Sequence, residues 1–432
     1  MIRGVHKESH LGRILSAIAS VLVITTLSLC AAGKETHERS EKGVSPYSIE
    51  IITMDPGKDL FSRWGHICIM VTDRMQQTRV VYNFGVFDFQ DPALALRYAK
   101  GYLNFWVEIV PYGPMVAYYR SGHRGMVTRT LDLTDKQAQV IAQRLSVYIR
   151  PENRTYAYRH YLDNCCTRIR DLLYEVLGDD IKKQFDTHLT ERTFRYYNRR
   201  ALTGLPVTRN IILFIMGREI DRPITRFGEQ FLPEVFAEDL DKITIDGHPL
   251  VSERRVLYAP EGPPVGEAPA LWEYIVSIVV VLCLVLGMGL PHLLNNCPKW
   301  VARSAGFGLA FWGLLAGFGG LLVIFLWTAT LHYDCYNNEN VLVFPVTHLL
   351  LLGPGITLMF KGTISERMGR FLRNYLIVAL ALLGINLLLK LGPLFQHNYQ
   401  FIFVAAVMNG SSLLILRRVQ SAVRNSPPLT RR

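Results

Sequence analysis

Cysteine is scarce in this 432-residue chain, which has only seven, and no two of them form a C-x-x-C pair. Two lie inside apolar stretches, so few remain that face an oxidising compartment. This number is too small for a disulfide framework. The missing C-x-x-C pair argues against a zinc ribbon, and we expect neither a metal nor a cofactor. The seven are Cys30, Cys68, Cys165, Cys166, Cys283, Cys297 and Cys335.

Internal repeats are absent, and the net charge of +11 is not spread evenly. The lysines and arginines lie largely beside apolar stretches and at the C-terminus. That placement is typical of membrane topology, in which basic residues stay on the cytoplasmic side. We therefore expect no nucleic acid as a partner.

Six apolar stretches are long enough to cross a bilayer, which needs about 20 helical residues. Lys and Arg are missing from residues 332–340 and 392–398, whereas the alternate loops and the tail carry several. This alternation places residues 45–262 outside and the C-terminus in the cytoplasm. The stretches are Ile14–Ala32, Leu271–Leu290, Gly306–Leu331, Val341–Phe360, Tyr375–Leu391 and Tyr399–Leu416.

The first apolar stretch follows a basic N-terminus and is typical of a signal peptide or a signal anchor. Leu27–Cys30 loosely matches a lipobox, but a Leu directly before the Cys is a poor cleavage residue, so lipidation of Cys30 stays open. In each case the following domain is exported.

The rest of the sequence predicts an α+β outer domain followed by an all-α bundle of five transmembrane helices. We expect strands at Tyr47–Ile52, His66–Val71, Arg79–Phe84, Tyr102–Val110 and Met126–Leu131. Helices are predicted at Asp91–Lys100, Ala138–Tyr148 behind a Thr134–Gln137 capping box, and Cys165–Leu177 between Asp163-Asn164 and Gly178. The predicted segments are 1–32 (signal or anchor), 33–46 (linker), 47–262 (outer domain), 263–270 (linker), 271–416 (bundle) and 417–432 (basic tail).

The most informative local feature is the run from Asp163 to Asp171, which contains adjacent cysteines. A Cys in the first turn of a helix meets unpaired N–H groups and the positive end of the dipole, which both lower a thiol pKa. Arg168 and Arg170 add positive potential. The simpler interpretation is a pair of small buried residues, and only one of two adjacent cysteines can face a cleft.

A second feature is Arg63-Trp64-Gly65-His66 at the start of a predicted strand. A His at a strand end can act as the base for a thiol, although a hydrogen-bonded structural His is the alternative. Asn83 on the next predicted strand has a carbonyl that can hold the imidazole tautomer, or it can simply cap the strand end.

Together these features resemble the Lnb-type N-terminal periplasmic domain family over about residues 47–240. The spans and the segment NENVLVFP (338–345) also resemble the membrane half of full-length members. The four matching stretches are SRWGHICIMV (62–71), YNFGVFDF (82–89), RPENRTYAYRHYLDNCCTRIRDLL (150–173) and DRPITRFGEQFLPEVF (221–236).

The resemblance implies a permuted papain-like fold, related to the NlpC/P60 and lecithin:retinol acyltransferase group, in which the His strand precedes the Cys helix. Cys165 would be the nucleophile and His66 the general base, with Asn83 as the orienting residue. Cys166 falls where small residues are tolerated. Residues that would bind substrate or brace the site are Arg63, Asp88, Arg168, Arg170 and the outer-loop His332.

Full-length members resemble lipoprotein N-acyltransferases of the bacterial inner membrane. The implied partners are a membrane phospholipid as acyl donor and the N-terminus of a diacylated lipoprotein as acceptor. Two alternatives stay open. A Cys–His pair also serves hydrolases, such as peptidoglycan amidases, endopeptidases and phospholipases, and the fold can persist in a non-enzymatic membrane sensor.

Overall fold

The computed structural model describes residues 45–88, 90–260 and 299–424. The described residues from Tyr47 onward form one compact unit. The predicted spans Ile14–Ala32 and Leu271–Leu290 lie outside the described residues, as do both predicted linkers apart from residues 45 and 46.

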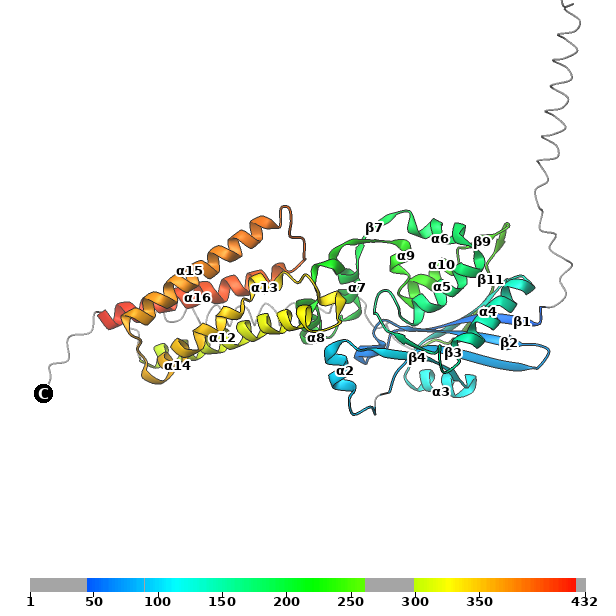
Figure 1. Cartoon of the computed structure of the whole chain (residues 1–432), viewed down its shortest axis with the longest axis horizontal. Helices are drawn as coiled ribbons and strands as arrows, with labels where there is room; N and C mark the ends of the chain where they lie inside the picture. Colours follow the sequence, from blue (N-terminus) through cyan, green and yellow to red (C-terminus); the bar gives the residue numbers. More distant parts are fainter. Residues whose placement is uncertain (1–44, 89, 261–298, 425–432) are drawn as a thin grey trace, which may run out of the picture. The chain divides into compact units, whose positions relative to one another are not determined.

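A seven-stranded antiparallel sheet organises the outer domain, with strand order β11-β5-β1-β2-β3-β4-β6 (Figure 1). The predicted strands are all present, and β5 has the predicted bounds. The strands are β1 (Tyr47–Met54), β2 (His66–Asp73), β3 (Thr78–Val86), β4 (Asn104–Val110), β5 (Met126–Leu131), β6 (Thr155–Ala157) and β11 (Val251–Tyr258).

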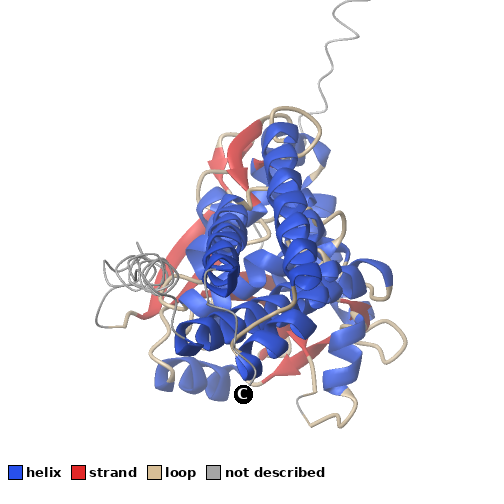
Figure 2. Ribbon diagram, turned by 90° about the vertical axis from the view of Figure 1, so that its left-hand side faces the viewer, coloured by secondary structure: helices blue, strands red, loops and turns tan. Residues whose placement is uncertain are grey.

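Helices cover both faces of this sheet (Figures 1 and 2), which makes the domain mixed α/β as predicted. The predicted helices are α2 (Leu94–Lys100), α4 (Asp135–Tyr148) and α5 (Cys165–Leu177), and α3 (Tyr112–Ser121) was not predicted. The other elements are α6 (Asp179–Asp186), β7 (Leu189–Thr193), α7 (Phe194–Ala201), α8 (Pro206–Ile215), η1 (Leu60–Ser62), η2 (Arg218–Asp221), β8 (Pro223–Thr225), α9 (Arg226–Glu229), α10 (Pro233–Leu240), β9 (Thr244–Ile245) and β10 (His248–Pro249).

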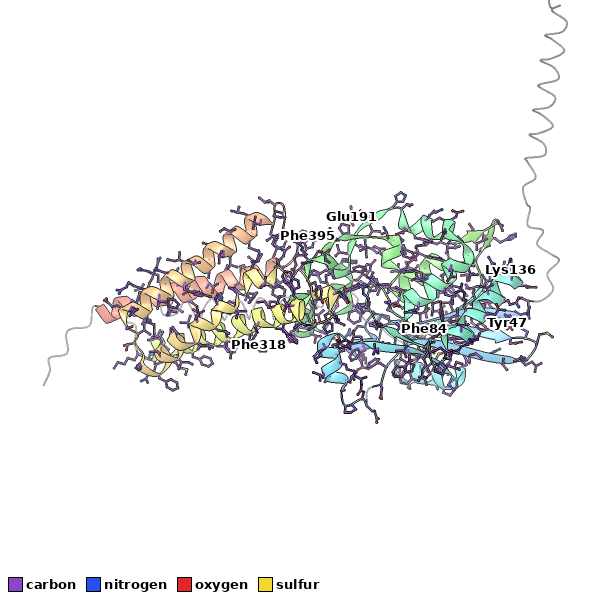
Figure 3. All side chains as sticks on the ribbon, in the orientation of Figure 1. Tyr47, Phe84, Lys136, Glu191, Phe318 and Phe395 are labelled. Carbon is purple, nitrogen blue, oxygen red and sulfur yellow. The ribbon has the colours of Figure 1, made fainter. Side chains whose placement is uncertain are left out.

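Side chains of β2 alternate between two apolar cores because successive residues of a strand point to opposite faces. Ile67 and Ile69 pack with α4, α5 and α10 on one face, and Phe84 of β3 joins them there (Figure 3). Cys68 and Met70 pack on the other face with α3. His66 is two residues before Cys68, so its side chain lies on the same face of the sheet as Cys68 and Met70, the face covered by α3.

Helix α5 starts at Cys165 because Asn164 caps it. Asn164 Oδ1 accepts hydrogen bonds from the N–H groups of Cys166 and Thr167 at 2.8 and 2.9 Å. In return, the Asn164 N–H donates to Thr167 Oγ1 at 2.8 Å. The Asn164 side-chain NH₂ also donates to the backbone oxygens of His160 and Phe231. A single buried amide thus fixes the helix start and two neighbouring loops.

Four helical segments within the described residues are long and apolar enough to cross a membrane: Lys299–Thr328, Asn340–Lys361, Glu366–Leu389 and Tyr399–Gln420. Each coincides with a predicted span. Their elements are α12 (Lys299–Thr328), η3 (Tyr333–Cys335), α13 (Asn340–Val343), η4 (Val346–Leu351), α14 (Leu352–Lys361), α15 (Glu366–Leu389) and α16 (Tyr399–Arg424).

The second of these segments is not one continuous helix. It consists of α13, η4 and α14, with Pro345 between the first two. Glycines on α12 let this irregular segment approach closely: a Cβ on Gly306 would lie 2.7 Å from the backbone oxygen of Gly355, and one on Gly313 would lie 2.8 Å from that of His348. Close packing through small residues is typical of helices in membranes.

Buried amides of the C-terminal region cap the end of α8. The backbone oxygen of Phe214 accepts from Asn338 and Asn340 at 2.9 and 2.7 Å, and that of Met216 accepts from Gln396 at 2.9 Å. These carbonyls would otherwise be unpaired at a helix C-terminus. The Phe214 ring packs against those of Phe344 and Phe401, 5.1 and 5.3 Å away, so α8 is held by both apolar and polar contacts.

Replacing Asn164 with Ala should destabilise the protein more than replacing Thr134, the cap of α4. Thr134 also heads a capping box, but it is exposed, so its loss should cost about 1 kcal/mol. Asn164→Ala also leaves buried backbone groups without a hydrogen-bond partner, and each such group lowers the free energy of unfolding by roughly 1–3 kcal/mol. Thermal unfolding of the purified full-length variants measures the loss of stability in each. Equal losses in the Asn164 and Thr134 variants would contradict the role given to the buried Asn164 amide.

Candidate functional site

His66 and Asn83 form a hydrogen-bonded pair on β2 and β3, as the sequence predicted for an orienting residue. His66 Nε2 lies 2.6 Å from Asn83 Oδ1. Because a carbonyl oxygen can only accept, Nε2 carries the proton in the neutral ring and Nδ1 keeps a free lone pair. The His66 ring also stacks on Tyr119 of α3, with centroids 6.3 Å apart. The imidazole is therefore fixed in both orientation and tautomer.

The adjacent cysteines at the start of α5 have different surroundings. Cys166 is fully buried, and its Sγ donates to the backbone oxygen of Gln230 at 3.2 Å. Cys165 is only partly buried and packs at the edge of the core. Of the two, Cys165 is the thiol that a substrate can reach. No hydrogen bond joins Cys165 to His66 within the described ranges, and catalytic contacts of this kind often tighten only when substrate binds.

Burial decides the protonation of both groups. It raises the pKa of Cys165 to about 11, although the backbone N–H groups of Ile67, Cys166 and Cys165 itself act in the opposite direction. It lowers the pKa of His66 to about 4, against the effect of the Asn83 hydrogen bond. The expectation of a lowered thiol pKa at this helix start is therefore wrong, because loss of hydration outweighs the N–H groups. At neutral pH the site holds a thiol and a neutral imidazole.

Beside Cys165 the β2–β3 ladder is unpaired, and we call this unpaired stretch the opening. Pairing of β2 with β3 begins at Ile69↔Tyr82, and β3 has an irregularity between Phe84 and Val86. Gly85 lies in this irregularity with φ +91°, a conformation that favours glycine. A Cβ at Gly85 would lie 3.6 Å from Cys165 Cβ, so a side chain there would occupy the space beside the thiol.

Arg124 is a charged residue of the site that the sequence analysis missed. Its guanidinium lies over the Tyr119 ring, 4.7 Å from the centroid, and its Nε donates to the backbone oxygen of Asp55 at 2.7 Å. Its charge acts on the pKa of both Cys165 and His66. No local pattern marks Arg124, because it meets the site only through tertiary packing between α3 and β5.

Tyr156 of β6 was also missed. Its hydroxyl is buried, and no hydrogen-bond partner for it lies among the described residues. A Cβ at Gly85 would lie 3.9 Å from this hydroxyl, so Tyr156 borders the same opening as Cys165. Burial raises the pKa of the Tyr156 hydroxyl, and the neighbouring Cys165 raises it further. The group is a neutral donor facing the opening.

Two of the predicted substrate-binding residues lie in loops. Arg63 donates to the backbone oxygen of Thr203 at 3.2 Å and lines a small pocket with Trp64 and Tyr197. Asp88 is exposed, and its carboxylate accepts the N–H of Gln90 at 2.7 Å. In these positions Arg63 braces α7, and Asp88 closes a turn.

Arg168, Arg170 and His332 are each engaged by neighbours. Arg168 pairs with Asp163 and lies 4.2 Å over the Tyr156 ring, so it supports the wall of the opening. Arg170 is buried with its guanidinium 3.7 Å over Phe227. His332 Nε2 donates to the backbone oxygen of Tyr98 at 2.6 Å, away from β2.

None of the five predicted substrate-binding residues has a hydrogen bond or ion pair to Cys165 within the part of the chain that the structure describes, and their substrate roles stay predictions. Over those residues, no group of three or more His, Cys, Asp or Glu side chains is arranged to hold a metal ion.

Residues 36–200 match the family model described as the Lnb N-terminal periplasmic domain, which confirms the resemblance over this stretch. The match ends before the motif at 221–236 and before the apolar helices. No curated protein and no solved structure matches the chain. With the four apolar helices, the match indicates a membrane-bound protein whose N-terminal domain is periplasmic.

Alkylation of Cys165 should become faster with rising pH throughout the neutral range. Its pKa of about 11 keeps the thiolate a minor species, so the rate should increase roughly tenfold per pH unit between pH 6 and 9. Iodoacetamide labelling of the full-length Cys166→Ala variant, followed by mass spectrometry of the Cys165 peptide, measures this slope. A rate that is constant across the same range would indicate a preformed thiolate and contradict the assignment of a neutral pair.

Proposed function

We propose that this protein is a lipoprotein N-acyltransferase, which moves a fatty acyl chain from a membrane phospholipid to the α-amine of a diacylated lipoprotein. The observation that carries the proposal is the partly exposed Cys165 at a helix start, whose sulfur lies by the N–H of Ile67, the residue after the His66 that Asn83 orients, in a periplasmic domain joined to membrane helices.

The fold is proposed to be a permuted papain-like one. Two features support it: the strand with His66 precedes the helix with Cys165, and the helix packs on the sheet that contains the His strand. A nucleophile on a helix, a base on a strand and an amide that orients the base form a constellation that suits acyl transfer.

In the first step, Nδ1 of His66 takes the thiol proton as Cys165 Sγ attacks an ester carbonyl of the phospholipid. The tetrahedral adduct collapses, the ester C–O bond breaks, and the imidazolium returns the proton to the leaving alkoxide. A lysophospholipid departs and a thioester remains on Cys165. Because the imidazole is neutral at rest, it is ready to accept this proton.

In the second step the α-amine of the acceptor attacks the thioester. Such an amine has a pKa near 8 (roughly), so a usable fraction is unprotonated at neutral pH. His66 takes a proton from the attacking nitrogen and delivers it to the sulfur as the C–S bond breaks. The products are the amide on the lipoprotein and the free thiol.

The developing oxyanion needs a donor near Cys165. The N–H groups of Cys166 and Thr167 are already bonded to Asn164 Oδ1. The Cys165 N–H has no acceptor oxygen within the described ranges, and the Tyr156 hydroxyl is unpartnered there as well. These two groups are the proposed oxyanion donors.

For the membrane half we propose five spans after the periplasmic domain: the four described segments and Leu271–Leu290. With basic loops on the inner side, the C-terminus is then cytoplasmic and the protein lies in the bacterial inner membrane. Both substrates of the proposed reaction are anchored in the outer leaflet of that membrane, next to the periplasmic domain.

Cys165→Ala should abolish the conversion of diacylated to triacylated lipoprotein, and His66→Ala should lower its rate by about 10²–10⁴-fold, because the first removes the nucleophile and the second the base. Mass spectrometry of lipoprotein N-termini from cells that carry each variant measures the conversion, with protein levels confirmed by immunoblot.

Cys166→Ala is the matched control, since it removes a thiol one residue away that is fully buried, and it should retain conversion. Full conversion of diacylated to triacylated lipoprotein by the Cys165→Ala variant would contradict the assignment of Cys165 as the nucleophile. Unchanged lipoprotein N-termini in a deletion strain, together with release of free fatty acid by the purified protein, would favour the phospholipase alternative.

A further inference from the structure

Helix α2 (LALRYAK) contacts Leu331 and His332 but buries none of its own apolar side chains within the described residues. None of its residues is buried, and Leu96 is 61% exposed. Tyr102, just after the helix, is 53% exposed. A seven-residue helix is marginal in water without a packing partner. Exposed apolar side chains gathered on one short segment indicate an interaction site.

The α2 segment is attached to the outer end of a membrane span. The N–H of Leu331 donates to the backbone oxygen of Lys100 at 2.9 Å, and His332 donates to that of Tyr98. Leu331 lies three residues beyond the end of α12, so Lys100 is within about 10 Å of that end. The N–H of Gly217 donates to the oxygen of Asp334 in the same loop, which places this end of α12 on the side of the periplasmic domain.

A row of aromatic rings leads from the surface toward the thiol. The ring of Phe61 lies 5.7 Å from that of Phe87, which stacks on Phe105 at 4.7 Å, and Phe105 stacks on Tyr158 at 4.3 Å. Phe61 is 59% exposed, whereas Phe105, Tyr158 and Cys165 all pack against the same apolar core. The row thus has one end at the surface and one at the site.

We propose that α2 is seated in the outer leaflet and that the ring row takes an acyl chain of a membrane phospholipid from there to Cys165. Charge favours this occupant, because the exposed Lys100 ends the helix that carries the exposed Leu96, so a lysine that can pair with a lipid phosphate accompanies the apolar side chain. Aromatic and basic side chains together are typical of a membrane interface.

The α2 segment and the ring row would be the docking surface of the acyl donor, and in that respect the proposal rests on the proposed function. Lipid capture itself needs no chemistry at Cys165. The two ideas can therefore fail separately, and the experiment uses the Cys165→Ala chain, in which acyl transfer cannot occur.

Benzoylphenylalanine is placed at Leu96, at Phe61 or at Met75 in the full-length Cys165→Ala protein, in vesicles of phosphatidylethanolamine and phosphatidylglycerol. Met75 is the matched control: it is 82% exposed and apolar, but it lies beyond the far end of β2 from His66. After irradiation, mass spectrometry measures phospholipid adducts. Positions 96 and 61 should give at least tenfold more adduct than position 75.

Absence of lipid adducts at either position 96 or position 61 overturns the proposal. It is also overturned if position 96 cross-links to residues 261–298 of the same chain, since the α2 surface would then be covered by protein. All three substituted positions are exposed, so size-exclusion chromatography in detergent should match the unsubstituted protein. If position 96 captures lipid while unmodified protein fails to acylate lipoproteins, the docking surface stands and the proposed function falls.

Discussion

The site depends on one buried amide, that of Asn164. Its oxygen holds the first turn of α5 and its NH₂ holds the loops at His160 and Phe231. With these bonds in place, the Cys166 and Thr167 amides are used, whereas the Cys165 amide has no acceptor oxygen within the described ranges. A different N-cap would start the helix as well, but it would leave the two loop carbonyls unpaired in a buried place, which costs free energy for each. The cap therefore sets both the nucleophile and its surroundings.

Burial then determines how the nucleophile can act. The thiol pKa is raised to about 11 and that of His66 is lowered to about 4, so an ion pair at rest is disfavoured. In the proposed reaction the proton moves from Cys165 to His66 only as the sulfur–carbon bond begins to form. A neutral site of this kind has a further consequence, because an apolar acyl chain can approach it without stripping water from two charges. With Cys165 and His66 both neutral, Arg124 is the cation whose charge still acts on the site.

The parts of this arrangement that could be predicted are those with local signals. Cys165–Leu177 has its predicted bounds because Asn164 and Gly178 mark the ends, and the His66–Asn83 pair follows from two neighbouring strands. The direction of the thiol pKa could not be predicted, because burial arises from tertiary packing. Arg124 reaches the site from 41 positions away in the chain, with no motif around it. Hydropathy likewise marks the span at 340–361 but not its interruption at Pro345.

The end of α8 argues that the membrane helices do more than anchor the domain. Its carbonyls could have been left to water, as at most helix ends. Instead Asn338, Asn340 and Gln396, all fully buried, donate to Phe214 and Met216. Buried polar contacts tolerate little displacement, because each broken bond leaves an unpaired group. They therefore hold the periplasmic domain at a fixed height relative to these helices. The acyl transfer that we propose, between two substrates in one leaflet, would need the Cys165 thiol at such a height.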